Sequence, residues 1–294
     1  MKTRSGFTMV ELSITLVLVS LVVGGLMSVL LDQQRFYSGA SDIIDTRASV
    51  RQIADVLPND LRALAPAEGD IYEMSDRHIR YRATTGSTVA CAVNQAAGTI
   101  VIPPVTLSRD NGLSSWIARP ERGDSVLIFD SGVSPPVWRV HVLTADPTPG
   151  VCVPFTASAA EANSGLTLTV DTPVAVGITA GASLRFFRAS QYELYQAGDG
   201  KYYLGFFDCL ITRNPVCSTV QPVSGPYLPF AASGPSGMRF TYFGANGAVT
   251  NVPALVTRID VVARAESRNE IRGGGRKREL YRDSTMFSVA VRNQ

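Results

Sequence analysis

The chain has 294 residues, of which 45% are apolar and 18% are charged, with 27 Lys and Arg against 25 Asp and Glu. This length allows one large domain or two small ones. The low charge fraction, together with 25 Gly and 17 Pro, excludes a coiled-coil rod and a charged disordered chain and predicts short strands joined by turns. A net charge of +2 gives no case for nucleic-acid binding.

The mean hydropathy of +0.11 is high for a soluble domain, and most of the excess comes from residues 12–31. This segment holds twenty residues with no charge and no proline. As a helix it would be about 30 Å long, which matches the hydrocarbon core of a bilayer. The rest of the chain averages about −0.06 per residue, an ordinary value for a soluble domain. The sequence therefore predicts a water-soluble protein with one membrane-length segment near its start.

Several interpretations of this segment are open. A secretory signal peptide needs a shorter apolar region and a small-x-small cleavage site, whereas Asp-Gln-Gln-Arg follows here at residues 32–35. A plain signal anchor, held on the cytoplasmic side by Lys2 and Arg4, fits the length and the charge. It leaves Glu11 unexplained, because a carboxylate inserted to full depth in a membrane costs about 2.5 kcal/mol or more. A Glu11 side chain that reaches back to interfacial water is the simplest structural explanation.

Residues 2–12 read Lys-Thr-Arg-Ser-Gly-Phe-Thr-Met-Val-Glu-Leu. The string resembles the class III leader of type IV pilins and type II secretion pseudopilins, in which a short basic leader ends in Gly. Phe follows that Gly, then Glu four residues later, then an apolar run; here these are Gly6, Phe7 and Glu11.

The resemblance implies the following processing and partners. A prepilin peptidase would cut between Gly6 and Phe7 and methylate the new amino group of Phe7. Glu11 would become the fifth residue of the mature chain and pair with the N-terminal amine of a neighbouring subunit. The other partners implied are further pilins or pseudopilins and the inner-membrane assembly platform, with no cofactor.

The helical pattern continues beyond the apolar run. Apolar or small residues recur at the three-and-four spacing of an amphipathic helix, at Phe36, Ala40, Ile43, Val50, Ala54, Leu57, Leu61 and Leu64, with Arg47 as a polar interruption. We expect one helix over residues 8–57, ended or kinked by Pro58. Gly24 and Gly25 weaken it by about 1 kcal/mol each relative to Ala. They indicate either close helix packing or, by the resemblance, a flexible point.

From about residue 66 the sequence changes to β-branched and aromatic runs separated by turn residues. The expected strands are 99–105, 125–130, 137–143, 166–170, 183–188, 192–196, 202–207, 239–243, 256–263 and 286–291. Asp199-Gly200 and Asn246-Gly247 predict two hairpins. A helix followed only by strands indicates an α+β fold with mainly antiparallel sheets.

We therefore expect four segments: a leader (1–6), the transmembrane or filament-core half of the helix (7–31), its amphipathic half (32–65) and a periplasmic β-rich domain (66–294). The residues after the anchor (34–37), the later helix (50–52, 60–62) and the segment 257–261 resemble most closely the PilW-type minor pilins and the J-type minor pseudopilins. The resemblance covers the helix and the C-terminus better than the middle of the chain.

The four cysteines lie on the side of the membrane opposite the basic leader, where disulfides form. We expect two disulfides, Cys209 with Cys217 around Asn214-Pro215, and Cys91 with Cys152 by default, although three pairings are possible. Buried free thiols are the alternative. A zinc site would need closer spacing and histidine ligands.

An enzyme is not expected. His78 and His141 lie in alternating segments typical of strand-surface histidines, and Gly-Pro-Ser-Gly at 234–237 is not a nucleophile elbow. The sequence contains no phosphate loop, dinucleotide fingerprint, His-Glu-x-x-His or calcium loop.

Basic residues gather near the end of the chain. Arg272, Arg276, Lys277 and Arg278 flank or follow three glycines, which predicts an exposed basic loop. A solvated hairpin or a partner-docking surface is favoured over DNA binding, because no aromatic residues are interleaved with these charges.

The function that we expect is a minor pilin or pseudopilin, inserted in the inner membrane by a single pass and then assembled into a type IV pilus or a type II secretion pseudopilus. The alternative is a bitopic envelope protein whose periplasmic β domain binds a ligand or an envelope partner without assembly. A secreted hydrolase would need cleavage after Leu31 and a catalytic constellation that the sequence does not contain.

Overall fold

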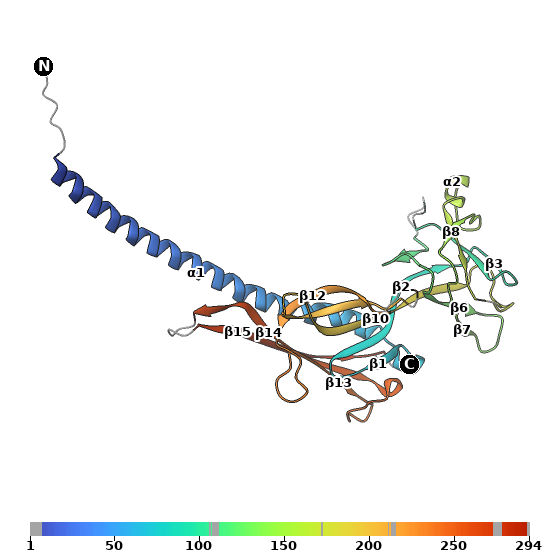
Figure 1. Ribbon diagram of the computed structural model, residues 1–294. Helices are drawn as coiled ribbons and strands as arrows, with labels where there is room; N and C mark the ends of the chain where they lie inside the picture. Colours follow the sequence, from blue (N-terminus) through green and yellow to red (C-terminus); the bar gives the residue numbers. More distant parts are fainter. Residues whose placement is uncertain are drawn as a thin grey trace, which may run out of the picture.

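The computed structural model describes residues 8–105, 107, 112–171, 173–210, 212, 216–272 and 278–292. Within them a single long helix, α1 (Met9–Arg62), precedes a body of antiparallel strands, which confirms the expected α+β class. The first half of α1 extends away from the β domain and the second half lies against it, with the C-terminus near the inner end of the helix (Figure 1).

Helix α1 continues through Pro58 and ends at Arg62, so the expected end at residue 57 is wrong. Proline inside a helix removes one backbone hydrogen bond. Here Leu57, Pro58 and Leu61 are all buried, and burial of these side chains offsets that loss. The last turn carries Arg62, a basic residue that favours the C-terminal end of a helix dipole.

The strands form two sheets. The larger sheet contains β1 (Ile71–Met74), β2 (His78–Val89), β5 (Ser115–Trp116), β6 (Ser125–Asp130), β7 (Val137–Val142), β10 (Ser183–Gln196), β11 (Tyr202–Asp208), β12 (Thr219–Tyr227), β13 (Met238–Phe243), β14 (Arg258–Arg272) and β15 (Arg278–Ala290). The smaller sheet contains β3 (Ala92–Asn94), β4 (Thr99–Ile102), β8 (Thr148–Gly150) and β9 (Gly165–Thr169). Short helical segments are η1 (Pro66–Glu68), α2 (Ala159–Ala162) and η2 (Pro253–Leu255).

Each expected strand corresponds to an observed strand, with some differences in extent. The two expected strands 183–188 and 192–196 are one continuous strand, β10, because the residues between them pair with β2 (Ser190 opposite Tyr81). Strands β14 and β15 are longer than expected because they pair with each other as a hairpin. Strands β1, β3, β5, β8 and β12 were not expected, and β2 was expected only as the alternating segment around His78. Strand β12 contains Pro222, Gly225 and Pro226, residues that weaken a strand pattern.

Both expected turns occur. Gly200 has φ +80° between β10 and β11, whose residues Gln196 and Tyr202 pair directly. Gly247 has φ +73°, and Phe243 pairs with Val249 across that turn. Positive φ values of this kind are readily adopted by glycine.

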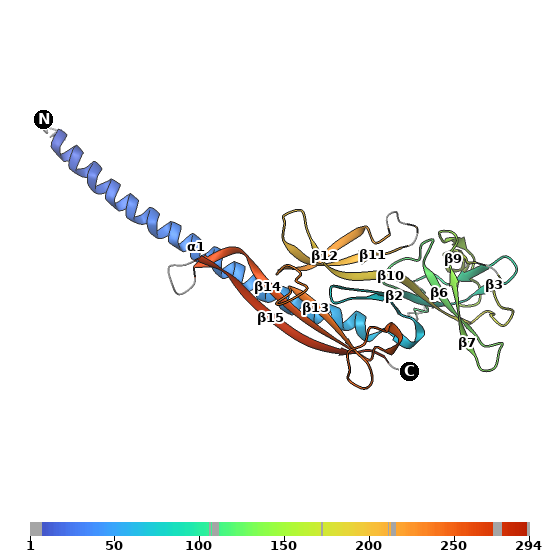
Figure 2. The same ribbon diagram turned by 60° about the horizontal axis from the view of Figure 1, so that its bottom comes forward.

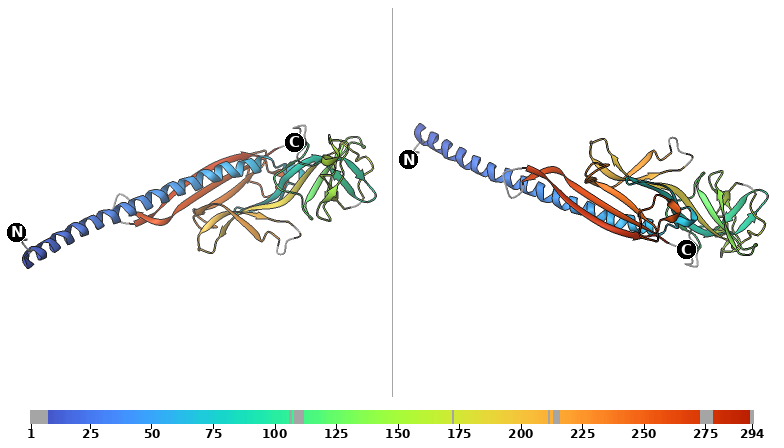
Figure 3. Two further views of the ribbon diagram at one scale, coloured as in Figure 1. Left: turned by 90° about the horizontal axis from the view of Figure 1, so that it is seen from above. Right: turned by 90° about the horizontal axis from the view of Figure 1, so that it is seen from below.

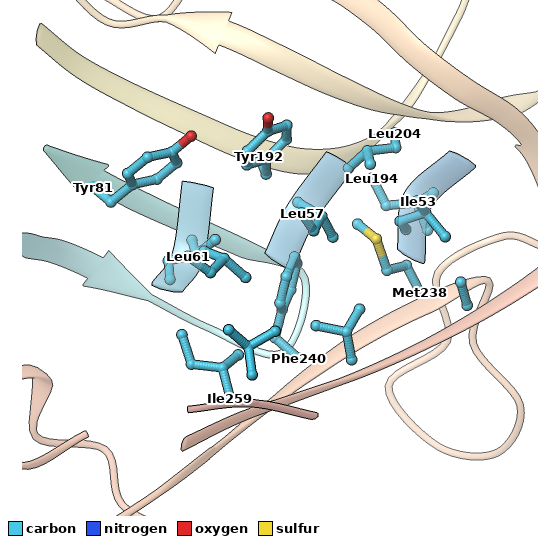
Figure 4. Close-up of a cluster of buried hydrophobic side chains, with 14 of the residues drawn as sticks. Ile53, Leu57, Leu61, Tyr81, Tyr192, Leu194, Leu204, Met238, Phe240 and Ile259 are labelled. Atoms are coloured by element: carbon cyan, nitrogen blue, oxygen red, sulfur yellow. The ribbon is translucent and has the colours of Figure 1, made fainter. Parts of the chain in front are cut away.

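The main hydrophobic core lies between the second half of α1 and the larger sheet. Ile53, Leu57 and Leu61 are fully buried against side chains from β2, β10, β11, β13 and β14 (Figure 4). The β14–β15 hairpin lies along α1 and extends toward its exposed half, as the views from above and below show (Figures 2 and 3).

A second hydrophobic cluster lies at the end of the molecule farthest from the N-terminus (Figures 1 and 2). It is built from β4, β6, β9 and the first residues of β10, for example Ile100, Val126, Leu168 and Phe186. We call this part the distal lobe. Strand β10 joins the lobe to the main core, because its first residues pair with β6 and its last with β11.

Leu57→Ala should lower the free energy of unfolding by about 2–5 kcal/mol, because it opens a cavity between α1 and the sheet. Ile44→Ala on the same helix removes a side chain that is 66% exposed and should change stability by less than about 0.5 kcal/mol. Urea unfolding of the detergent-solubilised full chain, followed by circular dichroism, measures both. Equal effects of the two substitutions would contradict the packing described.

Candidate functional site

The first half of α1 contacts nothing else in the described structure. Every residue from Met9 to Ser38 is exposed, including the whole apolar run. The 18-residue window of highest mean hydropathy in this helix reaches 2.6 and has no buried residue. A helix of this length and composition can cross a membrane. Its apolar surface has the extent and the exposure of a membrane anchor or of a helix packed between neighbours.

The few polar side chains in this half bond to their own helix. The hydroxyls of Ser13, Thr15, Ser20 and Ser28 donate to backbone carbonyl oxygens three or four residues earlier, at 2.8–2.9 Å. A polar group left unpaired in hydrocarbon is costly. These bonds therefore let the helix enter an apolar environment without a polar partner.

Glu11 and Thr8 form hydrogen bonds with each other at the N-terminus of α1. Thr8 is the N-cap: its hydroxyl accepts from the Glu11 backbone N–H at 3.3 Å. In return one Glu11 carboxylate oxygen accepts from the Thr8 backbone N–H and from the Thr8 hydroxyl, both at 3.0 Å. This reciprocal arrangement is a capping box. Sequence reasoning assigned Glu11 a role in assembly and missed its role as a cap, although Thr8 and Glu11 at three-residue spacing carry the signal.

The cleavage site expected between Gly6 and Phe7 lies outside the described residues. Gly24 and Gly25 lie inside α1, which continues through both, and a Cβ added at either would meet no atom within 4 Å. The space around them is therefore open on a single chain, as close approach of a neighbouring helix requires. Their role as a flexible point remains a prediction.

The middle of α1 is held by polar contacts that the apolar pattern did not indicate. The expected stripe placed Phe36 on the buried face, but Phe36 is 72% exposed. The buried positions here are Gly39, Asp42, Thr46 and Ser49. Asp42, a polar residue outside the expected apolar stripe, accepts from the Asn269 side-chain amide at 3.0 Å. The buried positions differ from the expected apolar stripe because the β14–β15 hairpin, and not an apolar core, covers this part of the helix.

Asp60 ties the inner end of α1 to the sheet. One Asp60 carboxylate oxygen accepts from the hydroxyls of Tyr81 at 3.0 Å and Tyr192 at 2.7 Å, and the two rings stack with centroids 5.8 Å apart. Burial first, and the nearby Asp60 charge second, raise the Tyr192 pKa far above its usual value. Both tyrosines donate to Asp60, and these bonds link the inner end of α1 to β2 and β10.

The structure contains two disulfides, Cys91–Cys152 and Cys209–Cys217. The first closes a long loop in the distal lobe, between the end of β2 and the segment after β8, and both of its residues are buried. The second joins residues separated by eight positions, after β11. Asn214 and Pro215, expected inside that loop, lie outside the described residues.

Of the expected basic surface, Arg276 and Lys277 lie outside the described residues. Arg272 ends β14 and Arg278 begins β15, where they are directly opposite each other. Arg278 is exposed.

The expectation of strand-surface histidines is wrong for His141. His141 is only 7% exposed and its Nδ1 lies 3.1 Å from an Asp171 carboxylate oxygen, because β7 packs this side chain inward. His78 is half-buried, beside the Ser75 hydroxyl at 2.9 Å. Across the described ranges no group of three or more His, Cys, Asp or Glu is arranged to hold a metal ion.

Comparison with known proteins adds one finding. Residues 1–27 match the family model described as the prokaryotic N-terminal methylation motif. No curated protein and no solved structure matches the chain. The motif and the exposed apolar helix together support a type IV pilin-like precursor that is cleaved by a prepilin peptidase and anchored in the membrane by one helix. Such a leader suggests a structural subunit rather than an enzyme and implies contacts with the peptidase and with other pilin subunits.

Replacing both Cys91 and Cys152 by Ala should cost about 4 kcal/mol of stability, and replacing Cys209 and Cys217 about 2.5 kcal/mol. The difference follows from loop length, since the disulfides join residues 61 and 8 positions apart. Thermal unfolding of the two double variants beside the wild type measures it. A larger loss for the Cys209–Cys217 variant would contradict this ranking.

Proposed function

We propose that the protein is a minor pilin or pseudopilin subunit that is assembled into a type IV pilus or a type II secretion pseudopilus, in its initiation or tip complex. Residues 1–6 are removed as the leader, and Phe7 becomes the methylated N-terminus. Residues 7–31 serve as membrane anchor and filament core. Residues 32–65 connect the anchor to the β-rich periplasmic domain, residues 66–294. The subunit is drawn from the inner membrane into the filament by the assembly platform.

The single observation that supports this proposal most is the division of α1 into two halves. An N-terminal methylation motif precedes an apolar half that is exposed throughout, and that half continues without interruption into a half packed against the β domain. An anchor continuous with the folded domain transmits the position of one to the other, because a helix is stiff over such lengths. A subunit that leaves the membrane for a filament needs this rigid connection.

Glu11 has the properties of an assembly contact. Its carboxylate is bonded only to Thr8 in the described structure, and no basic side chain there forms an ion pair with it. A carboxylate in an apolar environment is tolerated when a complementary charge is placed beside it. The amine of a neighbouring subunit's Phe7 would supply that charge, so correct stacking of subunits would be favoured over other arrangements.

The minor-subunit assignment rests on the resemblance of the helix and the C-terminal segment to PilW-type and J-type proteins. The distal lobe is consistent with it. The lobe lies at the end of the molecule opposite the anchor (Figure 1) and would be farthest from the membrane in a subunit that stands at the top of a filament.

Mass spectrometry of the N-terminus of the membrane-purified protein tests the processing. We expect a chain that begins at a methylated Phe7. An intact terminus at Met1 or Lys2 would overturn the proposal and favour a bitopic envelope protein that binds a ligand or partner without assembly.

Glu11→Gln should leave membrane insertion intact and reduce incorporation into filaments at least tenfold, because a neutral amide can still cap the helix but cannot pair with an amine. Glu11→Val should act in the same way. Immunoblotting of sheared filaments against the membrane fraction measures incorporation.

Thr8→Ala is the matched control, because it removes the capping hydroxyl and keeps the Glu11 charge. It should weaken the first helical turn by about 1 kcal/mol with normal incorporation. If Thr8→Ala reduces incorporation and Glu11→Gln does not, Glu11 acts only as a cap and the charge role is wrong.

A further inference from the structure

Strand β7 lies at a free edge of the larger sheet, in the distal lobe (Figures 1 and 2). Among the described strands it pairs with β6 alone, in register over its whole length. On its outer side the Val142 N–H donates to the Asp171 carboxylate at 2.8 Å, and the Asp171 N–H donates to the Val142 carbonyl oxygen at 3.0 Å. These bonds cover only the last residue of β7. The outer edge is therefore open over residues 137–141.

The open edge presents backbone hydrogen-bonding groups. The backbone groups of successive residues in a strand point to opposite sides. Because Val142 turns its N–H and C=O away from β6 and toward Asp171, Val140 and Trp138 turn theirs the same way. In the described part of the chain nothing bonds to these outward groups. Two donors and two acceptors are thus available to an added strand along about 17 Å of edge.

The edge of β7 lacks the features that keep natural edge strands from pairing with another chain. Such strands are commonly protected by lysine, proline or a bulge. Strand β7 reads Val-Trp-Arg-Val-His-Val, without lysine or proline, and its pairing with β6 has no bulge. Its Arg139 is already paired with the buried Asp130, with Nε 2.6 Å from a carboxylate oxygen. By contrast β15, which also lies at an edge of this sheet, carries four charged residues.

The sheet face beside this edge is apolar and carries a single charge. Trp138 is 39% exposed and Val140 is 55% exposed. They stand beside Phe129 and Leu127, their cross-strand neighbours on β6. The Arg185 guanidinium, from β10, lies 4.9 Å from the centre of the Trp138 ring, and among the described residues no acidic group forms an ion pair with it. Aromatic residues and arginine are the types enriched in protein interfaces.

We propose that the outer edge of β7 accepts an extended acidic segment of a partner protein as an added β-strand. The backbones of Trp138 and Val140 would bond to a segment of about five residues, and every second side chain of that segment would lie on the apolar face. An acidic side chain among these would pair with Arg185. This inference goes beyond the proposed function and requires neither leader cleavage nor filament assembly.

Two other occupants agree less well with the structure. A second copy of this chain would bring another Arg185 and no carboxylate to the face, and like charges brought together in an interface are unfavourable. A sugar ring would stack on an open aromatic ring, but Arg185 already lies over the Trp138 ring. Stacking would also leave the backbone groups of the edge unused.

Hydrogen exchange of the detergent-solubilised full chain, with a synthetic peptide added, tests the proposal. The probe is Thr-Val-Thr-Asp-Thr-Val-Thr, which as a strand places Val, Asp and Val on one face. With the peptide at about ten times its Kd, we expect the backbone amides of Trp138 and Val140 to exchange about tenfold more slowly. The amides of β11 and β12 should not change.

Two matched peptides separate the sources of affinity. A peptide that is N-methylated at alternate backbone nitrogens, along the edge that faces β7, should give no protection because it has no N–H to donate to the strand. A peptide with Lys in place of Asp should bind about fivefold more weakly, because it loses the ion pair with Arg185.

Variants of the chain test the same contacts. Val140→Pro removes one outward N–H and leaves the bonds to β6 in place, and it should weaken peptide binding at least tenfold, whereas Val140→Thr keeps the N–H and should bind as the wild type does. Arg185→Gln should weaken binding about two- to fivefold. Arg47→Gln is its matched control, because it removes the same charge from an arginine that lies over Tyr281 on α1. Fluorescence polarisation of the labelled peptide measures binding.

An acidic peptide that gives no protection overturns the proposal. Equal protection by the N-methylated peptide does so too, because binding would then not use the strand edge, and this comparison leaves the fold of the chain unaltered. With no effect of the peptide, protection that rises with protein concentration would identify a second copy as the occupant, and protection by chitotetraose would identify a sugar; either overturns the proposal. None of these results depends on the N-terminus, so they are distinct from failure of the processing experiment.

Discussion

The packing of the second half of α1 on the larger sheet is the constraint on which the rest of the structure depends. Ile53, Leu57 and Leu61 are fully buried there, and Asp60 adds hydrogen bonds to two buried tyrosines. Because α1 is one helix, fixing this half also fixes the direction of the exposed half. The anchor, the β14–β15 hairpin and the distal lobe therefore have defined positions along one axis.

The two ends of the helix are stabilised by different means. The inner half gains from removal of apolar surface from water, at about 25 cal/mol per Å². The outer half has no tertiary contact and depends on its own hydrogen bonds: the capping box of Thr8 and Glu11, and the hydroxyls that bond back to the helix. A helix without tertiary support is marginal in water. It becomes stable in a bilayer or between other helices, which are the two environments that the proposed function gives it.

The sequence was sufficient to predict those parts of the fold that are set by local patterns. The apolar run, the expected strand segments and the Gly200 and Gly247 turns are all properties of short segments. The Thr8–Glu11 spacing is also local, although its capping role was not predicted. What could not be predicted depended on partners far away in the chain. Pro58 lies inside the helix because Leu57 and Leu61, on either side of it, are buried against strands that are far away in the chain. Asp42 is buried because Asn269, 227 positions later, supplies its hydrogen bond. Strand β12 forms despite its prolines because β11 pairs with it.

The same distinction applies to the candidate site. Glu11 could be identified from a motif of adjacent residues, but whether its carboxylate meets an amine depends on a second chain. The capping box already determines the surroundings of the carboxylate within one subunit. In a single subunit the Glu11 carboxylate already accepts two hydrogen bonds from Thr8, so its negative charge is partly stabilised before any partner arrives. An incoming amine need not replace these bonds, since a carboxylate has about four acceptor positions. Capping and assembly can therefore act together, and the cap would hold the carboxylate in place for the next subunit.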